Sequence, residues 1–167
     1  MSPTFQRRLL GAPAIEPADA QSLVASARAI KRRPDGMVTR LRGKNIALLC
    51  ARPECDCALR FDAAASALGA RVARIEPAPA WLDDGAALGA DTARLLESLY
   101  DAVDCEEVPP GFARRLQAQL GVPVYDGLAR ADHPIFRLLA DVAGAGRAPD
   151  DDDRRALLQA TLVETLL

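Results

Sequence analysis

The feature that most constrains the fold is a short, unbroken apolar run, Asn45–Cys50, in which every residue after the first is apolar. A strand with one face in water would alternate apolar and polar residues, whereas a continuous run is typical of a strand buried on both faces, as in a parallel sheet. Three further strands are expected at 71–75, 102–105 and 122–125. A sheet buried on both faces needs helices above and below it.

Helical segments occupy the stretches between the predicted strands, because their apolar residues recur every three or four positions. We expect helices at 17–33, 57–68, 92–100, 109–119, 134–143 and 154–167, and a long loop at 76–90. Asp91, Glu54 and Asp56 stand at expected helix starts, where acidic side chains are favourable caps. The alternation predicts an α/β fold: a three-layer domain with a mainly parallel four-stranded sheet flanked by helices and joined by right-handed crossovers.

One domain of ordinary size accounts for the 167 residues, half of which are apolar. We expect residues 1–148 to form the α/β domain and residues 149–167 to form an acidic linker followed by an amphipathic helix. The apolar stripe of that helix needs cover from this domain or from a partner chain, and it consists of Leu157, Leu158, Leu162, Val163 and Leu166.

Charge and hydropathy exclude several functions. The net charge of −2 gives no general attraction to nucleic acid or to an anionic membrane. The sequence has no apolar run of the ~18–20 residues that a membrane span needs, and its first residues lack the layout of a secretory signal. We therefore expect a cytoplasmic chain whose four cysteines are reduced.

Ligands of parallel sheets bind outside the carboxyl ends of the strands. Three polar segments, 51–57, 104–107 and 126–133, follow predicted strands and should meet at one edge. This edge is the candidate site before any family is considered.

Several motifs together resemble the aspartate/ornithine transcarbamoylase family. Residues 41–49 resemble its L-x-G-K-x-x-A-L segment, 91–94 its D-T-A-R, and 122–128 its V-P-V-x-N-G-L. His133-Pro134 and 139–141 resemble its H-P-x-Q-x-L-A-D. The similarity covers residues 7–143 and implies the fold of the N-terminal, carbamoyl-phosphate-binding domain. It also implies a trimer with shared active sites and a second domain that binds the amino-acid substrate.

The phosphate-binding residues that the resemblance implies are replaced here. The S-T-R-T-R segment aligns with 54–58, which has two acids and lacks both arginines. A further family arginine aligns with Glu106, the glutamine of H-P-x-Q aligns with Phe136, and a basic loop from the neighbouring subunit aligns with 85–90. The degenerate pocket comprises Glu54, Cys55, Asp56, Cys57, Glu106, His133 and Phe136.

Electrostatics makes these replacements costly for a phosphate ligand. A phosphate group is held by amides, hydroxyls and arginines, and a carboxylate ~4 Å away costs about 4 kcal/mol at an effective dielectric of 20. We expect no useful binding of carbamoyl phosphate and no catalytic residues. The chain would then be a structural, regulatory or oligomerising subunit, either a homo-oligomer (a trimer by the resemblance) or bound to a full-length transcarbamoylase.

Other interpretations stay open at this stage. The acids can be helix caps that seal the pocket, and no cofactor is then expected. Alternatively Cys55, Cys57, Cys105 and His133 can form a tetrahedral zinc site in a pocket adapted to another ligand, with Asp56 or Glu106 as a substitute ligand. Cys55 or Cys57 can also be a reactive thiol, although the nearby acids oppose it. The sequence can also be a piece of a longer protein.

Overall fold

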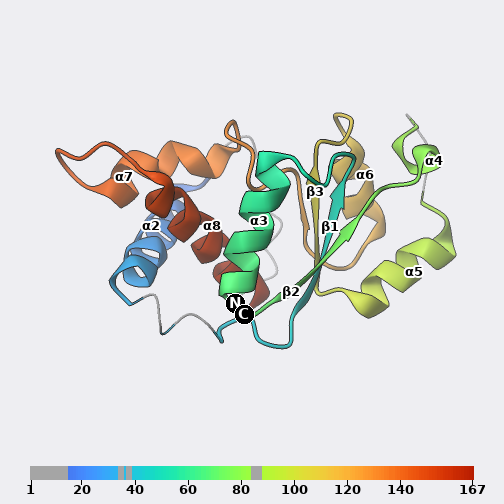
Figure 1. Ribbon diagram of the computed structural model, residues 1–167, viewed down its shortest axis with the longest axis horizontal. Helices are drawn as coiled ribbons and strands as arrows, with labels where there is room; N and C mark the ends of the chain where they lie inside the picture. Colours follow the sequence, from blue (N-terminus) through green and yellow to red (C-terminus); the bar gives the residue numbers. More distant parts are fainter. Residues whose placement is uncertain (1–14, 34–35, 37–38, 84–87) are drawn as a thin grey trace.

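A four-stranded parallel sheet forms the centre of the protein, whose computed structural model describes residues 15–33, 36, 39–83 and 88–167. The strand order is β2-β1-β3-β4 (Figure 1), with bounds Asn45–Cys50 for β1, Arg71–Ile75 for β2, Ala102–Glu106 for β3 and Val124–Tyr125 for β4. The predicted fold class, an α/β domain with a parallel sheet flanked by helices, is confirmed.

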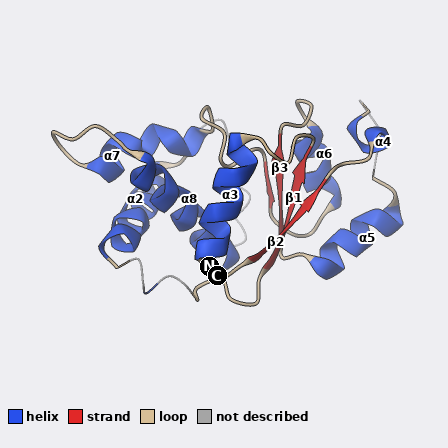
Figure 2. Ribbon diagram, in the orientation of Figure 1, coloured by secondary structure: helices blue, strands red, loops and turns tan. Residues whose placement is uncertain are grey.

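Helices lie on both sides of the sheet (Figure 2). One group comprises α2 (Pro17–Arg32), α3 (Asp56–Ala67), the 3₁₀ helix η2 (Pro134–Leu138), α7 (Leu139–Ala143) and α8 (Asp151–Leu166). The other comprises α4 (Pro79–Leu82), α5 (Ala90–Leu99) and α6 (Phe112–Gln119). Among the helices of the described ranges, none is long and apolar enough to cross a membrane.

Alternation along the strands divides the core in two. Successive strand residues point to opposite faces, so Leu48 and Cys50 join the core under α3 and α8, whereas Leu49 joins the core under α5 and α6. On β3, Cys105 lies in the core under α5 and α6. This alternation decides which side chains of the strands can reach the candidate site.

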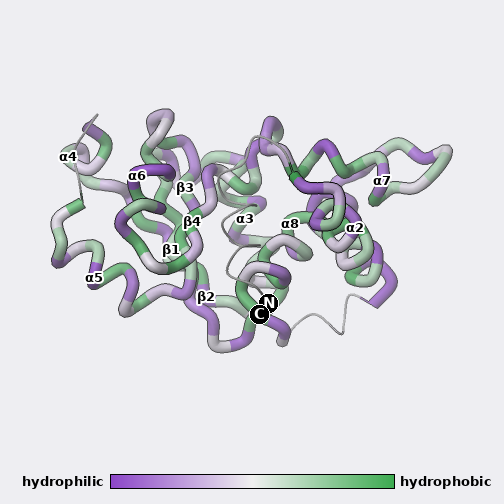
Figure 3. The backbone as a smooth tube through the Cα atoms, turned by 180° about the vertical axis from the view of Figure 1, so that it is seen from behind, coloured by the Kyte–Doolittle hydropathy of each residue, from purple (hydrophilic) through white to green (hydrophobic). Residues whose placement is uncertain are grey.

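The last helix packs on its own domain. α8 contacts α2, α3 and α7, and its leucine stripe is buried in the larger core (Figure 3 shows α8 among these helices from behind). The acidic run before it is not a linker as expected, because α8 begins at Asp151 with Asp150 as its N-cap. Asp150 and Asp153 form a reciprocal capping box, and their side chains satisfy each other's backbone amides.

Smaller differences concern loops and helix ends. A one-turn helix, α4, lies in the expected 76–90 loop, and Pro79 stands at its start. The expected helix at 134–143 is divided into η2 and α7, and β4 is two residues long. α5 begins at Ala90 with Gly89 as N-cap, so Asp91 is not the cap; it forms an ion pair with Arg94 at 3.1 Å instead.

Candidate functional site

A cavity of about 540 Å³ opens at the carboxyl edge of the sheet, where the sequence placed the candidate site. The segments after β1, β3 and β4 meet there as expected. The lining residues are Arg52, Glu54, Cys55, Asp56, Cys57, Arg60, Glu107, Ala129, Arg130, Ala131 and Asp132. The cavity therefore combines thiols, acids and arginines.

Three thiols converge at the inner side of this cavity. The Sγ atoms of Cys50 and Cys55 are 3.7 Å apart, and those of Cys55 and Cys57 are 2.7 Å apart. The Cys57 Sγ lies 3.8 Å from Oε1 of Glu107. The sequence interpretation had not placed Cys50 or Glu107 in this group. The turn between β1 and α3 brings Cys50 back to Cys55, and the pairing of β1 with β3 brings Glu107 to this edge.

A cysteine caps the helix that begins in the cavity. Cys55 is the N-cap of α3, and its Sγ accepts a hydrogen bond from the Ala58 amide at 3.4 Å. The expectation that Glu54 and Asp56 are the caps is therefore wrong. Both acids are exposed instead, and Asp56 sits in the first turn, where a negative charge favours the helix dipole.

Two acids are buried under the thiols. Asp104 and Glu106 have no exposed surface and accept hydrogen bonds from the Leu128 and Ala129 amides at 3.1 and 3.0 Å. Their other oxygens, Asp104 Oδ2 and Glu106 Oε2, have no hydrogen-bond donor within the described residues. Burial, followed by the charge of Glu106, raises the pKa of Asp104 well above its ordinary value. Burial also raises the pKa of Glu106, whereas the Ala129 amide acts to lower it, so the two acids compete for charge in one buried site.

The arginines of the cavity are paired with acids of the same cavity. Arg52 bonds to Glu107 at 2.5 Å and Arg130 to Asp132 at 2.7 Å. The Arg130 side chain folds over Gly127, where an added Cβ would lie 2.2 Å from Arg130 Cδ. Arg60 and Arg130 were not singled out from the sequence: Arg130 lies in the expected 126–133 segment but in no motif, and Arg60 lies on α3 beyond the expected segment.

Burial keeps the thiols protonated. It raises the pKa of Cys50 to about 12 and raises that of Cys57 further still. The neighbouring Cys55 and Glu106 act in the same direction. A thiol needs its thiolate form to attack as a nucleophile, so these two environments do not favour covalent thiol catalysis.

The predicted zinc ligands are not brought together as a set. Cys105 points to the opposite face of the sheet, under α5 and α6, because adjacent residues of β3 alternate. His133 caps η2, where its Nδ1 accepts from the Ile135 amide at 3.4 Å. Burial and the charge of Arg130 lower the pKa of His133 to about 4. The group with ligand atoms mutually within 4.8 Å in the described part of the chain is instead Cys55, Cys57 and Glu107.

Phe136 belongs to the core and not to the cavity. It is buried in the larger apolar cluster, and the Arg154 guanidinium of α8 stacks over its ring at 5.1 Å. The position that aligns with a family glutamine therefore helps to fix α8.

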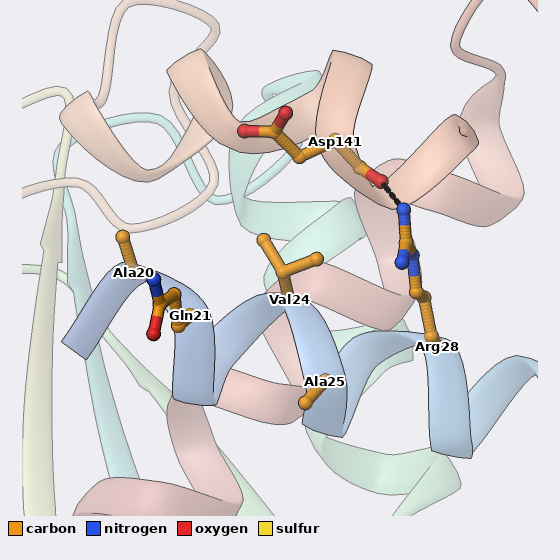
Figure 4. A pocket seen from close by; sticks show the side chains of 6 residues that line it. All are labelled: Ala20, Gln21, Val24, Ala25, Arg28 and Asp141. Carbon is orange, nitrogen blue, oxygen red and sulfur yellow. Dashed lines mark hydrogen bonds between the residues drawn. The ribbon is translucent and has the colours of Figure 1, made fainter. Parts of the chain in front are cut away.

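A second hollow, of about 460 Å³, lies between α2 and α7 (Figure 4). The Arg28 guanidinium crosses one end of it and donates to the Asp141 carbonyl oxygen at 2.5 Å. The remaining lining comes from Ala20, Gln21, Val24 and Ala25 of α2. This hollow lacks the convergence of charged side chains that the sheet edge has.

Comparison with known proteins agrees with this architecture. The family model for the aspartate/ornithine carbamoyltransferase, carbamoyl-P binding domain, matches residues 7–144. An ornithine carbamoyltransferase of Actinobacillus pleuropneumoniae is 36% identical over 103 residues, which cover 62% of this chain and 30% of that protein. The chain therefore spans about a third of the length of such relatives.

Solved structures show the same fold at low sequence identity. Aspartate transcarbamoylase from Trypanosoma cruzi, in complex with phosphate, aligns with a TM-score of 0.61 and 22% identity over 83% of this chain and 46% of that chain. Ornithine transcarbamoylase from Giardia lamblia aligns with a TM-score of 0.58 and 19% identity over 75% and 38%.

Proposed function

The chain belongs to the aspartate/ornithine carbamoyltransferase family through its carbamoyl-phosphate-binding domain, and we propose that it is a non-catalytic member. It keeps the domain as a scaffold but does not bind carbamoyl phosphate at the sheet edge. The observation that carries this proposal is the buried Glu106, which stands where the family arginine aligns and has no cationic hydrogen-bond partner in the part of the chain that the structure describes.

The charge balance of the cavity supports the loss of phosphate binding. Four acids line it against three arginines, and two of the arginines are already held by Glu107 and Asp132. A phosphate would have to displace these carboxylates and approach Glu106, at a cost of about 4 kcal/mol for each charge pair ~4 Å apart. Micromolar binding needs about 8 kcal/mol of net free energy, so two such pairs are enough to abolish it.

Calorimetry at pH 7.5 with carbamoyl phosphate tests this proposal. We expect no binding below millimolar concentration by this chain. The ornithine carbamoyltransferase of A. pleuropneumoniae serves as a positive control under the same conditions. A micromolar dissociation constant for the chain would reject the loss of the anion site.

Self-association is the role we propose for the scaffold. Leu95 and Leu99 lie one turn apart on α5 and are 57% and 50% exposed. An apolar pair of this kind is a candidate contact for a second copy, as the trimeric organisation implied by the resemblance suggests. The alternative partner is a full-length transcarbamoylase, which carries the same domain.

Light scattering coupled to size exclusion tests the association. We expect an oligomer, with the trimer as the first candidate, which Leu95→Glu together with Leu99→Glu reduces to monomer. Leu167→Glu is the matched control, because Leu167 is equally exposed at 56% but lies away from α5. A monomer at all concentrations that also fails to co-purify with a full-length transcarbamoylase contradicts this role.

A further inference from the structure

We propose that the thiols at the sheet edge bind a thiophilic divalent cation, with Zn²⁺ as the type ion. The first three ligands are Cys55, Cys57 and Glu107, whose ligand atoms lie within 4.8 Å of one another. Cys50 is the nearest further thiol: its Sγ is 3.7 Å from that of Cys55, and a shift toward the group of Cys55, Cys57 and Glu107 makes it the fourth ligand. This site is independent of the proposed loss of carbamoyl phosphate binding.

The spacing of the ligand atoms suits tetrahedral coordination. With Zn–S bonds of about 2.3 Å, two sulfurs of a tetrahedral site are about 3.8 Å apart. The distance between Cys50 and Cys55 is 3.7 Å and that between Cys57 and Glu107 is 3.8 Å. Cys55 and Cys57, at 2.7 Å, need to separate by about 1 Å, which side-chain rotation allows because both residues are only partly buried.

The buried Glu106 is a second observation that points to a cation. Its carboxylate is fully buried next to the Cys57 thiol, and its Oε2 lacks a hydrogen-bond donor within the described residues. A buried carboxylate oxygen without a donor is costly and calls for an explanation such as a bound ion. A cation among the thiols directly above it supplies the missing positive charge.

Two features of the surroundings offset part of the cost of ionising these thiols when a cation binds. Cys55 and Cys57 stand at the start of α3, where the helix dipole favours negative charge. Arg52, which bonds to Glu107, adds a positive charge at the open side. Binding then replaces three thiol protons by the cation, and those protons pass to the solvent without any redox change.

The donor set selects the kind of ion. Three sulfurs and one carboxylate oxygen suit zinc and other thiophilic ions, whereas Mg²⁺ and Ca²⁺ require oxygen ligands. The ion is closed off by four protein ligands, which is typical of a structural site rather than a catalytic one. The proposed role is therefore to fix the loop between β1 and α3 against β3.

Metal titration of the full chain tests this site. The chain is reduced, freed of metal with a chelator, and titrated with Zn²⁺ against a chromophoric chelator. We expect one ion per chain, and Co²⁺ in its place should give thiolate-to-cobalt absorption. Lowering the pH should weaken binding by up to about tenfold per pH unit for each proton released.

Variants separate this site from adventitious thiol binding. Cys57→Ser should weaken Zn²⁺ binding at least about 100-fold and Glu107→Gln about tenfold, since the loss of a mere outer-shell partner already costs about 10–100-fold. Cys105→Ala, which removes a buried thiol on the other face of the sheet, should leave the affinity unchanged. Circular dichroism checks that each variant is folded.

Three outcomes would overturn the proposal. The first is that the reduced wild-type chain binds less than stoichiometric Zn²⁺. The second is that Cys57→Ser binds as tightly as wild type, or that Cys105→Ala is weakened as much as Cys57→Ser. The third is a thiol count that reveals a persistent disulfide between Cys55 and Cys57 instead of four free thiols.

Discussion

Two buried acids, Asp153 and Asp104, occupy opposite electrostatic environments in this small domain. Both side chains are fully buried. Asp153, at the start of α8, is bonded to Lys31, Arg147 and the Asp150 amide. Asp104, on β3, accepts a hydrogen bond from the Leu128 amide and has a second acid beside it.

The difference appears in the sign of the two pKa shifts. Burial alone would raise the pKa of Asp153, but the bonds from Lys31, the Asp150 backbone and Arg147 hold it well below its ordinary value. For Asp104, burial and Glu106 both raise the pKa. The comparison teaches that burial tells nothing about an acid's role until its partners are known. Asp153 holds α2 and α8 together through its partners, whereas Asp104 adds a second buried acid to the site.

Removing the satisfied acid should have the largest effect. Asp153→Ala deletes an N-terminal capping interaction and two ion pairs, and we expect a loss of about 2–4 kcal/mol in the free energy of unfolding at pH 7. Urea denaturation measures it. Asp152→Ala is the control, because Asp152 is 66% exposed and pairs only with Arg155 among the ion pairs found. A loss below 1 kcal/mol for Asp153→Ala would show that Asp153 contributes no more to stability than an exposed acid such as Asp152.

Neutralising the unsatisfied acid, Asp104, should raise the free energy of unfolding rather than lower it. In the metal-free protein Asp104→Asn keeps a carbonyl acceptor for the Leu128 amide and places an uncharged NH₂ group beside Glu106. We expect the variant to be more stable than wild type by about 1–2 kcal/mol at pH 8, since it removes the cost of burying an ionisable group.

The pH dependence separates the two acids. Above the pKa of the unfolded carboxyl, Asp104 takes up a proton when the chain folds. Its contribution to the free energy of unfolding is therefore fully present below about pH 4. That contribution is lost as the pH rises toward the raised pKa of the folded protein, by at most about 1.4 kcal/mol per pH unit. Asp153 behaves in the opposite way, and its contribution is lost as pH falls below about 4. Wild type and Asp104→Asn should converge near pH 4. An equal difference between them at pH 4 and pH 8 would contradict the raised pKa.

A single partner of Asp153 should matter less than the acid itself. Lys31→Ala leaves Arg147 and the Asp150 amide in place, so we expect a loss of about 1 kcal/mol in unfolding free energy. Thermal denaturation of this variant beside Asp153→Ala measures the share of one cation. A loss as large as that of Asp153→Ala would show that Arg147 does not compensate.

The smallest effect is expected at the exposed ion pair of Asp91 and Arg94. Asp91 has a fully exposed side chain and does not cap α5. Exposed pairs contribute little because water screens them, so Asp91→Ala should change the unfolding free energy by less than about 0.5 kcal/mol. A loss above 1 kcal/mol in urea denaturation would indicate a contact beyond this pair.

The position of the site was predictable from the sequence, but its chemistry only in part. The loops after β1, β3 and β4 gather as expected because parallel strands end at the same edge. The predicted set of four zinc ligands was wrong for Cys105. The alternation of side chains along β3 could have shown this, because Cys105 cannot face the cavity if its neighbour Glu106 does. The contacts of Glu107 and Arg130 could not be assigned, because side chains in loops follow no periodic rule, and Arg60 lies on α3 outside any motif.

The amino-acid sequence alone determined the layers, the parallel sheet and the edge where a ligand would lie, since apolar periodicity and turn residues act over short distances along the chain. Only the tertiary structure decided which charges meet. Lys31 reaches Asp153, and Glu107 reaches both Cys57 and Arg52, across 50 or more residues. Such pairs form when packing brings distant segments within a few ångströms. That geometry then decides the partner of each buried acid and the direction in which its pKa shifts.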